Sequence, residues 1–274
     1  MRTPDALRGL LLEAVNPDRT APSITRAYRR AVEHFYRVLR ETGSYEEAVR
    51  RAEAGASDAD VRAYLQGYLS TYLDDPATRI RDLHEPLASA YYEGFEQGGR
   101  DQLSQWGERG DRFNLTDPAV IGAITAAALA MATFATNTSD ETLLNQAVRS
   151  ALRLDTIPDL DADHLAHLSS LIAPYRGYNE GRAETAIRSV PDGGIMKTWA
   201  VLGAANEPRE HHQAIEGLTI HLHDLFPVGL GVKYPHDWDM AGAEEWAYCR
   251  HFAEYSAPEH AQIEPWWGED VDLP

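Results

Sequence analysis

The chain has 274 residues, 43% of them hydrophobic, so it carries enough apolar surface for a folded core and is not disordered throughout. Its single cysteine, Cys249, excludes an internal disulfide and with it a secreted scaffold held together by disulfides. The net charge of −18 disfavours a broad nucleic-acid interface, because phosphates are neutralised by Lys and Arg, and we therefore expect no strong DNA binding.

Residues 1–190 show the pattern of successive helices. Residues 23–42 place apolar side chains at helical spacing, and Gly43 is expected to end that helix. Ser44 with Glu47 has the sequence of a capping box, in which the two side chains satisfy backbone N–H groups at a helix start. The pattern predicts a helical body.

Three further helix starts are predicted along this body. Ser57 precedes acidic residues that suit the positive end of a helix dipole. Asp117 and Pro118 have the sequence of an N-cap and a first helical residue. Thr138 with Glu141 has the sequence of another capping box.

Small residues recur at helical spacing after Pro86, which is expected near a helix start or a kink. Ala90, Gly94 and Gly98 follow at intervals of four residues. Side chains this small let a second helix approach closely, so we expect tight helix packing here.

An uncharged run, rich in Ala and Thr, covers residues 119–138. Its length would suffice to span a membrane, but few of its residues are strongly apolar. We expect a buried helix and no membrane partner.

The sequence pattern changes near residue 190. Residues 190–194 are a turn signal, and residues 196–202 and 217–223 have the pattern of strands. We therefore predict a mainly α fold in which a multi-helix N-terminal body is followed by a small α+β C-terminal module. The expected divisions are a helical body at 1–190, an α+β module at 191–257, and an acidic tail containing tryptophan at 258–274.

An ordered motif runs through this module. It comprises Trp199, Arg209, His212, Glu216, Gly217, Tyr234, Pro235, Cys249 and Arg250. Its order and spacing resemble the C-terminal module of Mu F-like minor head proteins, also called head morphogenesis proteins, of tailed phages and archaeal tailed viruses. Residues 175–188 resemble the helix that usually precedes that module. One position departs from the pattern, because His251 stands where the family has a second cysteine.

The resemblance covers about a quarter of the chain. It implies a minor structural protein of a tailed-virus head, associated with the portal or the inner capsid and acting in head assembly and genome packaging or delivery. Such a protein would be assembled in the host cytoplasm and reside in the head interior or at the portal vertex. We accordingly expect no enzyme, no catalytic residue and no cofactor. The portal protein is the leading partner, and the major capsid protein is a second candidate.

Histidines raise an alternative, because seven of the eleven lie between His211 and His260. His212, Cys249 and His251 have side chains that bind zinc, and a metal-dependent hydrolase could use them. No His-Glu-x-x-His motif or close cysteine pair accompanies them. We therefore favour a hydrogen-bonded structural role for these residues and assign no metal ligand.

Charge is distributed unevenly, which suggests where partners bind. Residues 1–60 hold ten Arg and ten acidic residues, whereas residues 191–274 hold four basic and fifteen acidic residues, a net charge of −11. We expect Arg29 and Arg30 to contact the portal, since arginine pairs with carboxylates at interfaces. The adjacent Trp266 and Trp267 are expected either to anchor a partner or to lie on the surface of the module itself.

Overall fold

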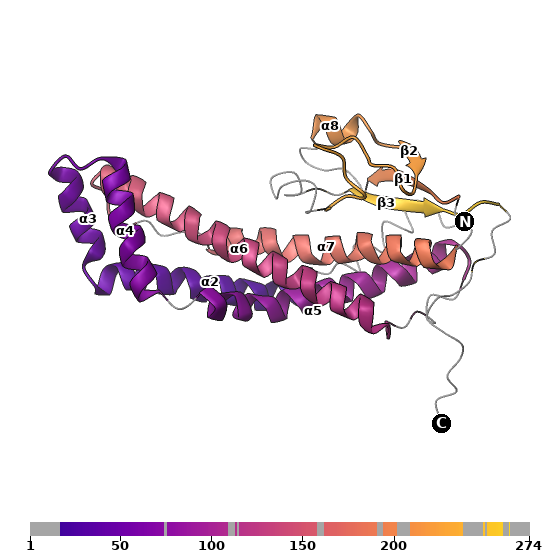
Figure 1. Ribbon diagram of the computed structural model, residues 1–274, viewed down its shortest axis with the longest axis horizontal. Helices are drawn as coiled ribbons and strands as arrows, with labels where there is room; N and C mark the ends of the chain where they lie inside the picture. The colour runs from indigo at the N-terminus through magenta and orange to yellow at the C-terminus, as the bar shows by residue number, and fades with distance from the viewer. Residues whose placement is uncertain are drawn as a thin grey trace, which may run out of the picture. The chain divides into compact units, whose positions relative to one another are not determined.

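The computed structural model describes residues 17–73, 76–108, 113, 115–157, 162–190, 194–201, 209–237, 249, 251–259 and 263. The predicted fold class is confirmed. The described part of the chain is mostly helical, with seven helices and one small antiparallel sheet near the C-terminus (Figure 1).

The helices occupy most of the first 190 residues. They are α2 (Pro17–Glu41), α3 (Ser44–Glu53), α4 (Asp58–Tyr72), α5 (Pro76–Gln105), α6 (Pro118–Leu152) and α7 (Ala162–Ser189). A short helix, α8 (Glu210–Gln213), lies later in the chain. The strands are β1 (Met196–Val201), β2 (Thr219–His221) and β3 (His251–Ser256). Pro86 lies inside α5.

The chain divides into two compact units. Unit 1 combines the described residues of 1–20, 88–126 and 170–274, and unit 2 combines those of 21–87 and 127–169. The divisions fall inside α2, α5, α6 and α7. The sheet therefore shares its unit with the C-terminal halves of α5 and α7 and with the start of α6.

Two predicted helix starts are confirmed by their caps. The Asp60 backbone N–H donates to Ser57 Oγ, and the Ser57 N–H donates to the Asp60 carboxylate, which forms a capping box at α4. The Ser57 hydroxyl also donates to the Asp60 carboxylate, and this bond, together with the one from the Ser57 N–H, lowers the pKa of Asp60. Asp117 accepts the Ala119 N–H at 2.8 Å, and Pro118 is the first residue of α6.

Two other predicted capping boxes are wrong. Gly43 is the N-cap of α3, with a left-handed φ of 67°, and Ser44 is its first helical residue. The buried Ser44 hydroxyl donates to the Leu39 carbonyl instead of capping. Thr138 lies inside α6, because that helix buries apolar side chains on both sides of it and continues to Leu152.

The prediction of a buried helix at 119–138 holds for one face of α6 only. Val120, Ile124, Ala128, Met131 and Ala132 are buried there. About a third of the most apolar window of α6 is buried, and exposed apolar side chains occur along it, namely Ile121, Leu129 and Phe134. By length and composition α6 could cross a membrane, a property that core helices of soluble proteins share.

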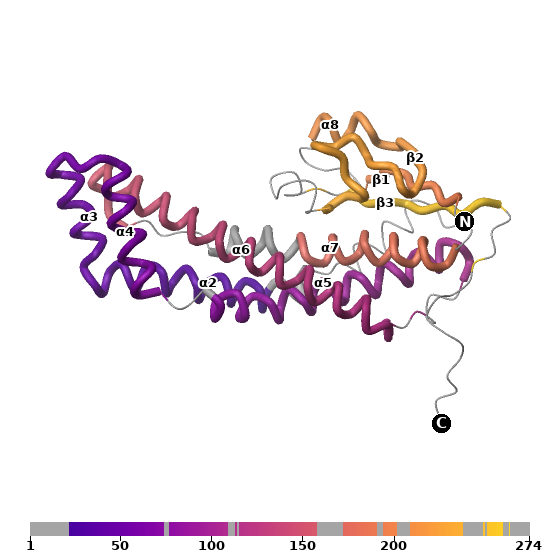
Figure 2. Tube along the Cα trace, viewed as in Figure 1, coloured from indigo at the N-terminus to yellow at the C-terminus, as the bar shows by residue number. Residues whose placement is uncertain are grey.

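Close packing of the C-terminal halves of α5 and α7 is confirmed (Figure 2). A Cβ atom added to Gly94 or Gly98 of α5 would lie 2.3 or 2.1 Å from a backbone oxygen of α7. The reverse also holds, since a Cβ atom at Gly177 or Gly181 of α7 would lie 2.2 or 2.1 Å from a backbone oxygen of α5. The two backbones are therefore in direct contact, which only glycine allows.

The sheet has the strand order β2-β1-β3, and both pairings are antiparallel. The strand predicted at 196–202 is confirmed as β1, in which Lys197 and Trp199 are buried. Of the strand predicted at 217–223, only residues 219–221 form a strand, β2. Gly217 before them has a φ of 79°, a left-handed conformation that favours a turn.

Edge strand β3 lies against the C-terminal half of α7 (Figure 1). The Ala253 N–H donates to Asn179 Oδ1, and the Ala253 carbonyl accepts from Arg182 Nε. Gln102 and Trp106 of the α5 end both donate to the Tyr255 carbonyl at 3.1 Å. Helix side chains thus satisfy the edge of the sheet, which blocks pairing with another strand.

Candidate functional site

Trp199 is at the centre of the module core. Its side chain is fully buried, and its ring packs edge-on against His212 and Phe226 and obliquely against His251, with centroid distances of 5.0–5.4 Å. Phe226 comes from the loop after β2, His212 from α8 and His251 from β3. One tryptophan therefore joins α8, β1, β3 and this loop in a single core.

A cluster of His212, Cys249 and His251 lies beside this tryptophan. The Cys249 sulfur is 3.6 Å from His212 Nδ1 and 3.5 Å from His251 Nδ1. The potential ligand atoms of all three residues lie within 4.8 Å of one another. Each residue is at most 5% exposed. The structure therefore brings together the three residues that the sequence identified as zinc-ligand types.

Glu216 orients one of these histidines. Its Oε1 lies 3.3 Å from His251 Nε2, so the ring can donate its Nε2–H to the carboxylate and direct Nδ1 towards the sulfur. Burial lowers the pKa of His251, whereas Glu216 opposes this and nearby Arg209 adds to it. A neutral ring is therefore favoured at neutral pH.

Gly217 and Arg209 have backbone roles in the motif. The Gly217 N–H donates to the Trp199 carbonyl at 2.8 Å, and the Trp199 N–H donates to the Leu218 carbonyl at 3.0 Å. Arg209 is the N-cap of α8, and its carbonyl accepts the His212 N–H. These bonds hold His212 and Glu216 at the two ends of one short turn.

The Tyr234–Pro235 loop is held against α7. The next residue, His236, has a φ of 68°, and its ring stacks on Tyr175 at 5.2 Å. Burial lowers the pKa of His236 to about 3, so the ring is neutral. Tyr234 is itself buried, and burial raises its pKa.

A buried lysine fixes the other side of this loop. Lys197 of β1 donates from Nζ to the Lys233 carbonyl at 2.7 Å and lies over the Phe226 ring. Burial lowers the pKa of Lys197 to about 8, partly opposed by Asp224 and Asp237. Asp237 also accepts the Lys233 N–H. Lys197 therefore has a structural role, because its contacts hold the loop against β1.

Sequence reasoning missed the polar residues that dock β3. Arg182 is fully buried and donates to Ala253, to the Tyr178 hydroxyl and to Gln105. The sequence did contain an indication of these residues. Asn179 and Arg182 are polar, lie three residues apart, and interrupt the small-residue face of the helix at 175–188. Nothing local indicated that a strand edge lay opposite them.

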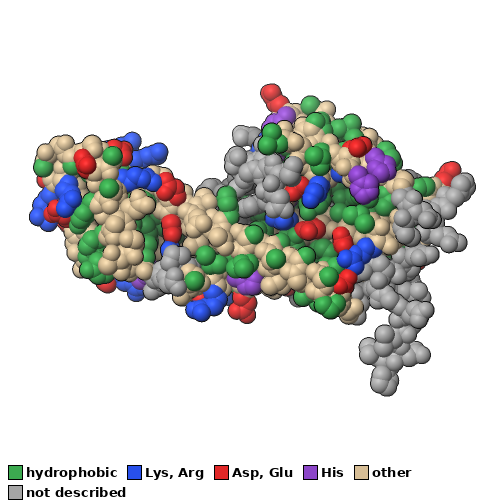
Figure 3. Space-filling model, in the orientation of Figure 1, with side chains coloured by type: hydrophobic (Ala, Val, Ile, Leu, Met, Phe, Trp, Pro, Cys, Tyr) green, Lys and Arg blue, Asp and Glu red, His purple; other side chains and the backbone are tan. Residues whose placement is uncertain are grey.

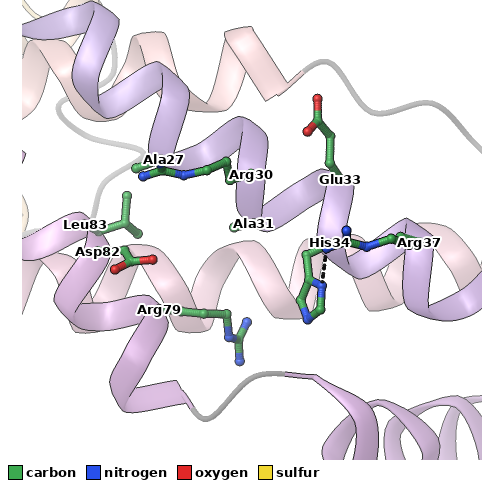
Figure 4. A pocket seen from close by; sticks show the side chains of 9 residues that line it. All are labelled: Ala27, Arg30, Ala31, Glu33, His34, Arg37, Arg79, Asp82 and Leu83. Atoms are coloured by element: carbon green, nitrogen blue, oxygen red, sulfur yellow. Dashed lines mark hydrogen bonds between the residues drawn. The ribbon is translucent and has the colours of Figure 1, made fainter.

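The remaining predicted residues are Arg29, Arg30, Arg250, Trp266 and Trp267. Arg250, Trp266 and Trp267 lie outside the described residues. Arg29 and Arg30 are exposed on α2. Arg30 also lines a cavity of about 540 Å³ between α2 and α5 (Figure 4).

The side chains that line this cavity are of mixed charge and polarity. Arg37 donates to His34 within it, and Arg79 is paired with Asp140 of α6. Asp82 adds negative charge on α5, whereas the carboxylate of Glu33 points away from these side chains (Figure 4). Both basic and acidic residues thus line the cavity, and the lining indicates no ligand class.

His212→Ala is expected to lower the free energy of unfolding by about 1–3 kcal/mol, because it removes one of the two buried histidine partners of the Cys249 sulfur and a ring that packs on Trp199. His211→Ala is the matched control. It replaces the neighbouring histidine, which is exposed, and should change stability by less than about 0.5 kcal/mol. Urea denaturation measures both, and equal stabilities of the two variants would contradict the structural role.

No protein-family model matches the chain, and no curated protein or solved structure was found to be similar to it. The resemblance to Mu F-like minor head proteins therefore rests on the motif residues.

Proposed function

We propose that the chain is a minor structural protein of a tailed-virus head, associated with the portal or the inner capsid and acting in head assembly and genome packaging or delivery. The observation that supports this most is the convergence of the motif. His212 and Cys249 are 37 residues apart in the chain, yet they meet in one buried cluster beside Trp199. Residues matched only by chance spacing would have no reason to share a core.

Further support comes from the helix that precedes the module. The family pattern includes such a helix, and here its residues 175–182 contact both the Tyr234–Pro235 loop and β3. The resembling segments thus interact as one structural unit. This is what we expect when a motif serves folding and docking rather than catalysis.

The charge distribution suggests how the protein would act inside a head. Packaged DNA would bind to a basic surface, and the C-terminal residues 191–274 carry fifteen acidic and only four basic side chains. The acidic module can therefore face DNA without binding it. Contacts with the portal are assigned to the N-terminal helices, where Arg29 and Arg30 are exposed.

A metal-dependent hydrolase is the second candidate, because the structure places two histidines and a cysteine within 4.8 Å. A catalytic metal needs an open position that substrate can reach. The three side chains are only 1–5% exposed, and among the described residues Glu216 provides the exposed edge of the cluster. This burial favours the structural function over hydrolysis.

The proposal predicts that the chain binds the portal protein of the same virus and that this binding depends on charged side chains. Co-expression and co-purification should yield the complex, and Arg29→Glu with Arg30→Glu should weaken it by about tenfold or more, since 1.4 kcal/mol of lost pairing changes affinity tenfold. The control is Arg50→Glu with Arg51→Glu, the same charge change at exposed residues of α3, where basic side chains gather (Figure 3).

Mass spectrometry of purified heads is the second measurement. The chain should be present in few copies, and the purified protein should not bind duplex DNA at moderate salt. Absence from the heads, equal portal affinity of the two double variants, or tight DNA binding would each refute the proposal.

A further inference from the structure

The cluster of His212, Cys249 and His251 has the spacing of a metal site. A tetrahedral zinc ion has bonds of about 2.3 Å to sulfur and about 2.0–2.1 Å to nitrogen, which place a sulfur and a nitrogen ligand about 3.6 Å apart. The two sulfur–nitrogen distances here are 3.6 and 3.5 Å. Both histidines also present the same atom, Nδ1, to the sulfur.

Glu216 adds an independent feature of zinc sites. Histidines that bind metals commonly donate their other ring N–H to a carboxylate, which fixes the tautomer and directs the lone pair at the ion. His251 has this arrangement, with Nε2 at 3.3 Å from Glu216 Oε1 and Nδ1 at the sulfur. Glu216 is therefore a positioning residue rather than a ligand.

We infer that His212, Cys249 and His251 bind one zinc ion that joins α8 to β3. On binding, the Cys249 thiol releases its proton to solvent and the sulfur coordinates as a thiolate. The thiolate and the Glu216 carboxylate supply two negative charges that balance the ion. Three protein ligands leave one tetrahedral position for water or a further ligand.

The position of the cluster explains what the ion would do. Among the residues that the structure describes, the apolar core around Trp199 consists of few side chains, chiefly Phe226, Val228 and Val232. Small modules of this kind commonly need a metal or a disulfide to be stable, and the chain has only one cysteine. Zinc would close the 37-residue segment between His212 and Cys249.

Hydrogen bonding alone is the competing explanation. The thiol has one proton, so it can donate to one Nδ1 and must accept an N–H from the other histidine. That arrangement is feasible and binds no metal, so metal content separates the two explanations. The inference does not depend on the proposed viral function, since zinc content is measured on the purified chain alone.

The first test is the zinc content of the full-length protein, produced with added zinc, purified under reducing conditions and dialysed against metal-free buffer. Mass spectrometry of the metal should give about one zinc per chain. Cys249→Ser and His251→Ala should retain less than about a tenth of this, because each removes one of three ligands. His211→Ala and His221→Ala, which change histidines outside the cluster, should retain it fully. A metal-free parent protein, or full zinc in Cys249→Ser, overturns the inference.

A second test avoids variants that fail to fold. Cobalt replacing zinc in the parent protein should give the visible bands of a tetrahedral ion and a near-ultraviolet charge-transfer band from the thiolate. Glu216→Gln should keep both bands while weakening zinc affinity by about 10–100-fold. Absence of the thiolate band in cobalt-treated parent protein refutes Cys249 as a ligand, and unchanged affinity in Glu216→Gln refutes its positioning role.

Discussion

Gly98→Ala is expected to lower the free energy of unfolding by about 1–3 kcal/mol, the usual cost of forcing an extra group into a close-packed contact. The new Cβ atom would lie 2.1 Å from the Tyr178 carbonyl oxygen, and 2.9 Å from the carbonyl carbon. Both atoms belong to the backbone, so no side chain can rotate away. The C-terminal halves of α5 and α7 would have to separate.

Gly122→Ala is the matched control for this prediction. Gly122 also lies inside a helix, but a Cβ atom there would meet nothing within 4 Å. Alanine should therefore stabilise α6 by about 0.5–1 kcal/mol through its higher helix propensity. The same change from glycine to alanine is thus expected to lower the free energy of unfolding at Gly98 and to raise it at Gly122. Urea denaturation measures both, and a shift in the same direction would contradict direct backbone contact.

Arg182→Ala is expected to lower the free energy of unfolding by about 3–5 kcal/mol, the usual loss when one partner is removed from a buried charged network. The guanidinium donates to the Ala253 carbonyl, the Tyr178 hydroxyl and Gln105, and it also lies 5.6 Å from the centre of the Phe252 ring. Its loss leaves these acceptors without a donor. It also creates a cavity beneath β3.

Arg182→Lys should restore little of this stability, because one ammonium group cannot reproduce the planar fork of donors. Arg100→Ala is the control. Arg100 pairs with Glu96 one turn away and its side chain is 43% exposed, so the change should cost less than about 0.5 kcal/mol. Hydrogen exchange provides a local measurement, since the Ala253 amide should lose protection in Arg182→Ala. Retained protection there would show that Arg182 does not hold the strand edge.

Local features of this protein were predictable because their hydrogen bonds close within four residues. Ser57 and Asp60 cap α4, and Asp117 begins α6, as the residues alone indicate. The two capping boxes that proved wrong show the limit of this reasoning. Ser44 and Thr138 have the required side chains, but the buried Ser44 hydroxyl donates to the Leu39 carbonyl, and Thr138 lies inside a long helix with buried side chains on both sides of it.

The candidate site was predictable as a set of residue types and not as an arrangement. Sequence spacing identified Trp199, His212 and Cys249, but the 37 residues between His212 and Cys249 do not determine a distance between their side chains. The antiparallel pairing of β1 with β3 brings Trp199 opposite Ala253, two residues from His251.

The amino-acid sequence by itself determined the helical body, the strand at β1, the close helix contact at Gly94 and Gly98, and the chemistry available in the module. Each follows from side-chain size, periodicity or capping within a short stretch of chain. Only the tertiary structure decided that Arg182 would hold the edge of β3, and that Glu216 would orient His251 towards Cys249. Such contacts join residues far apart in the chain, and burial of a shared core, rather than local propensity, selects them.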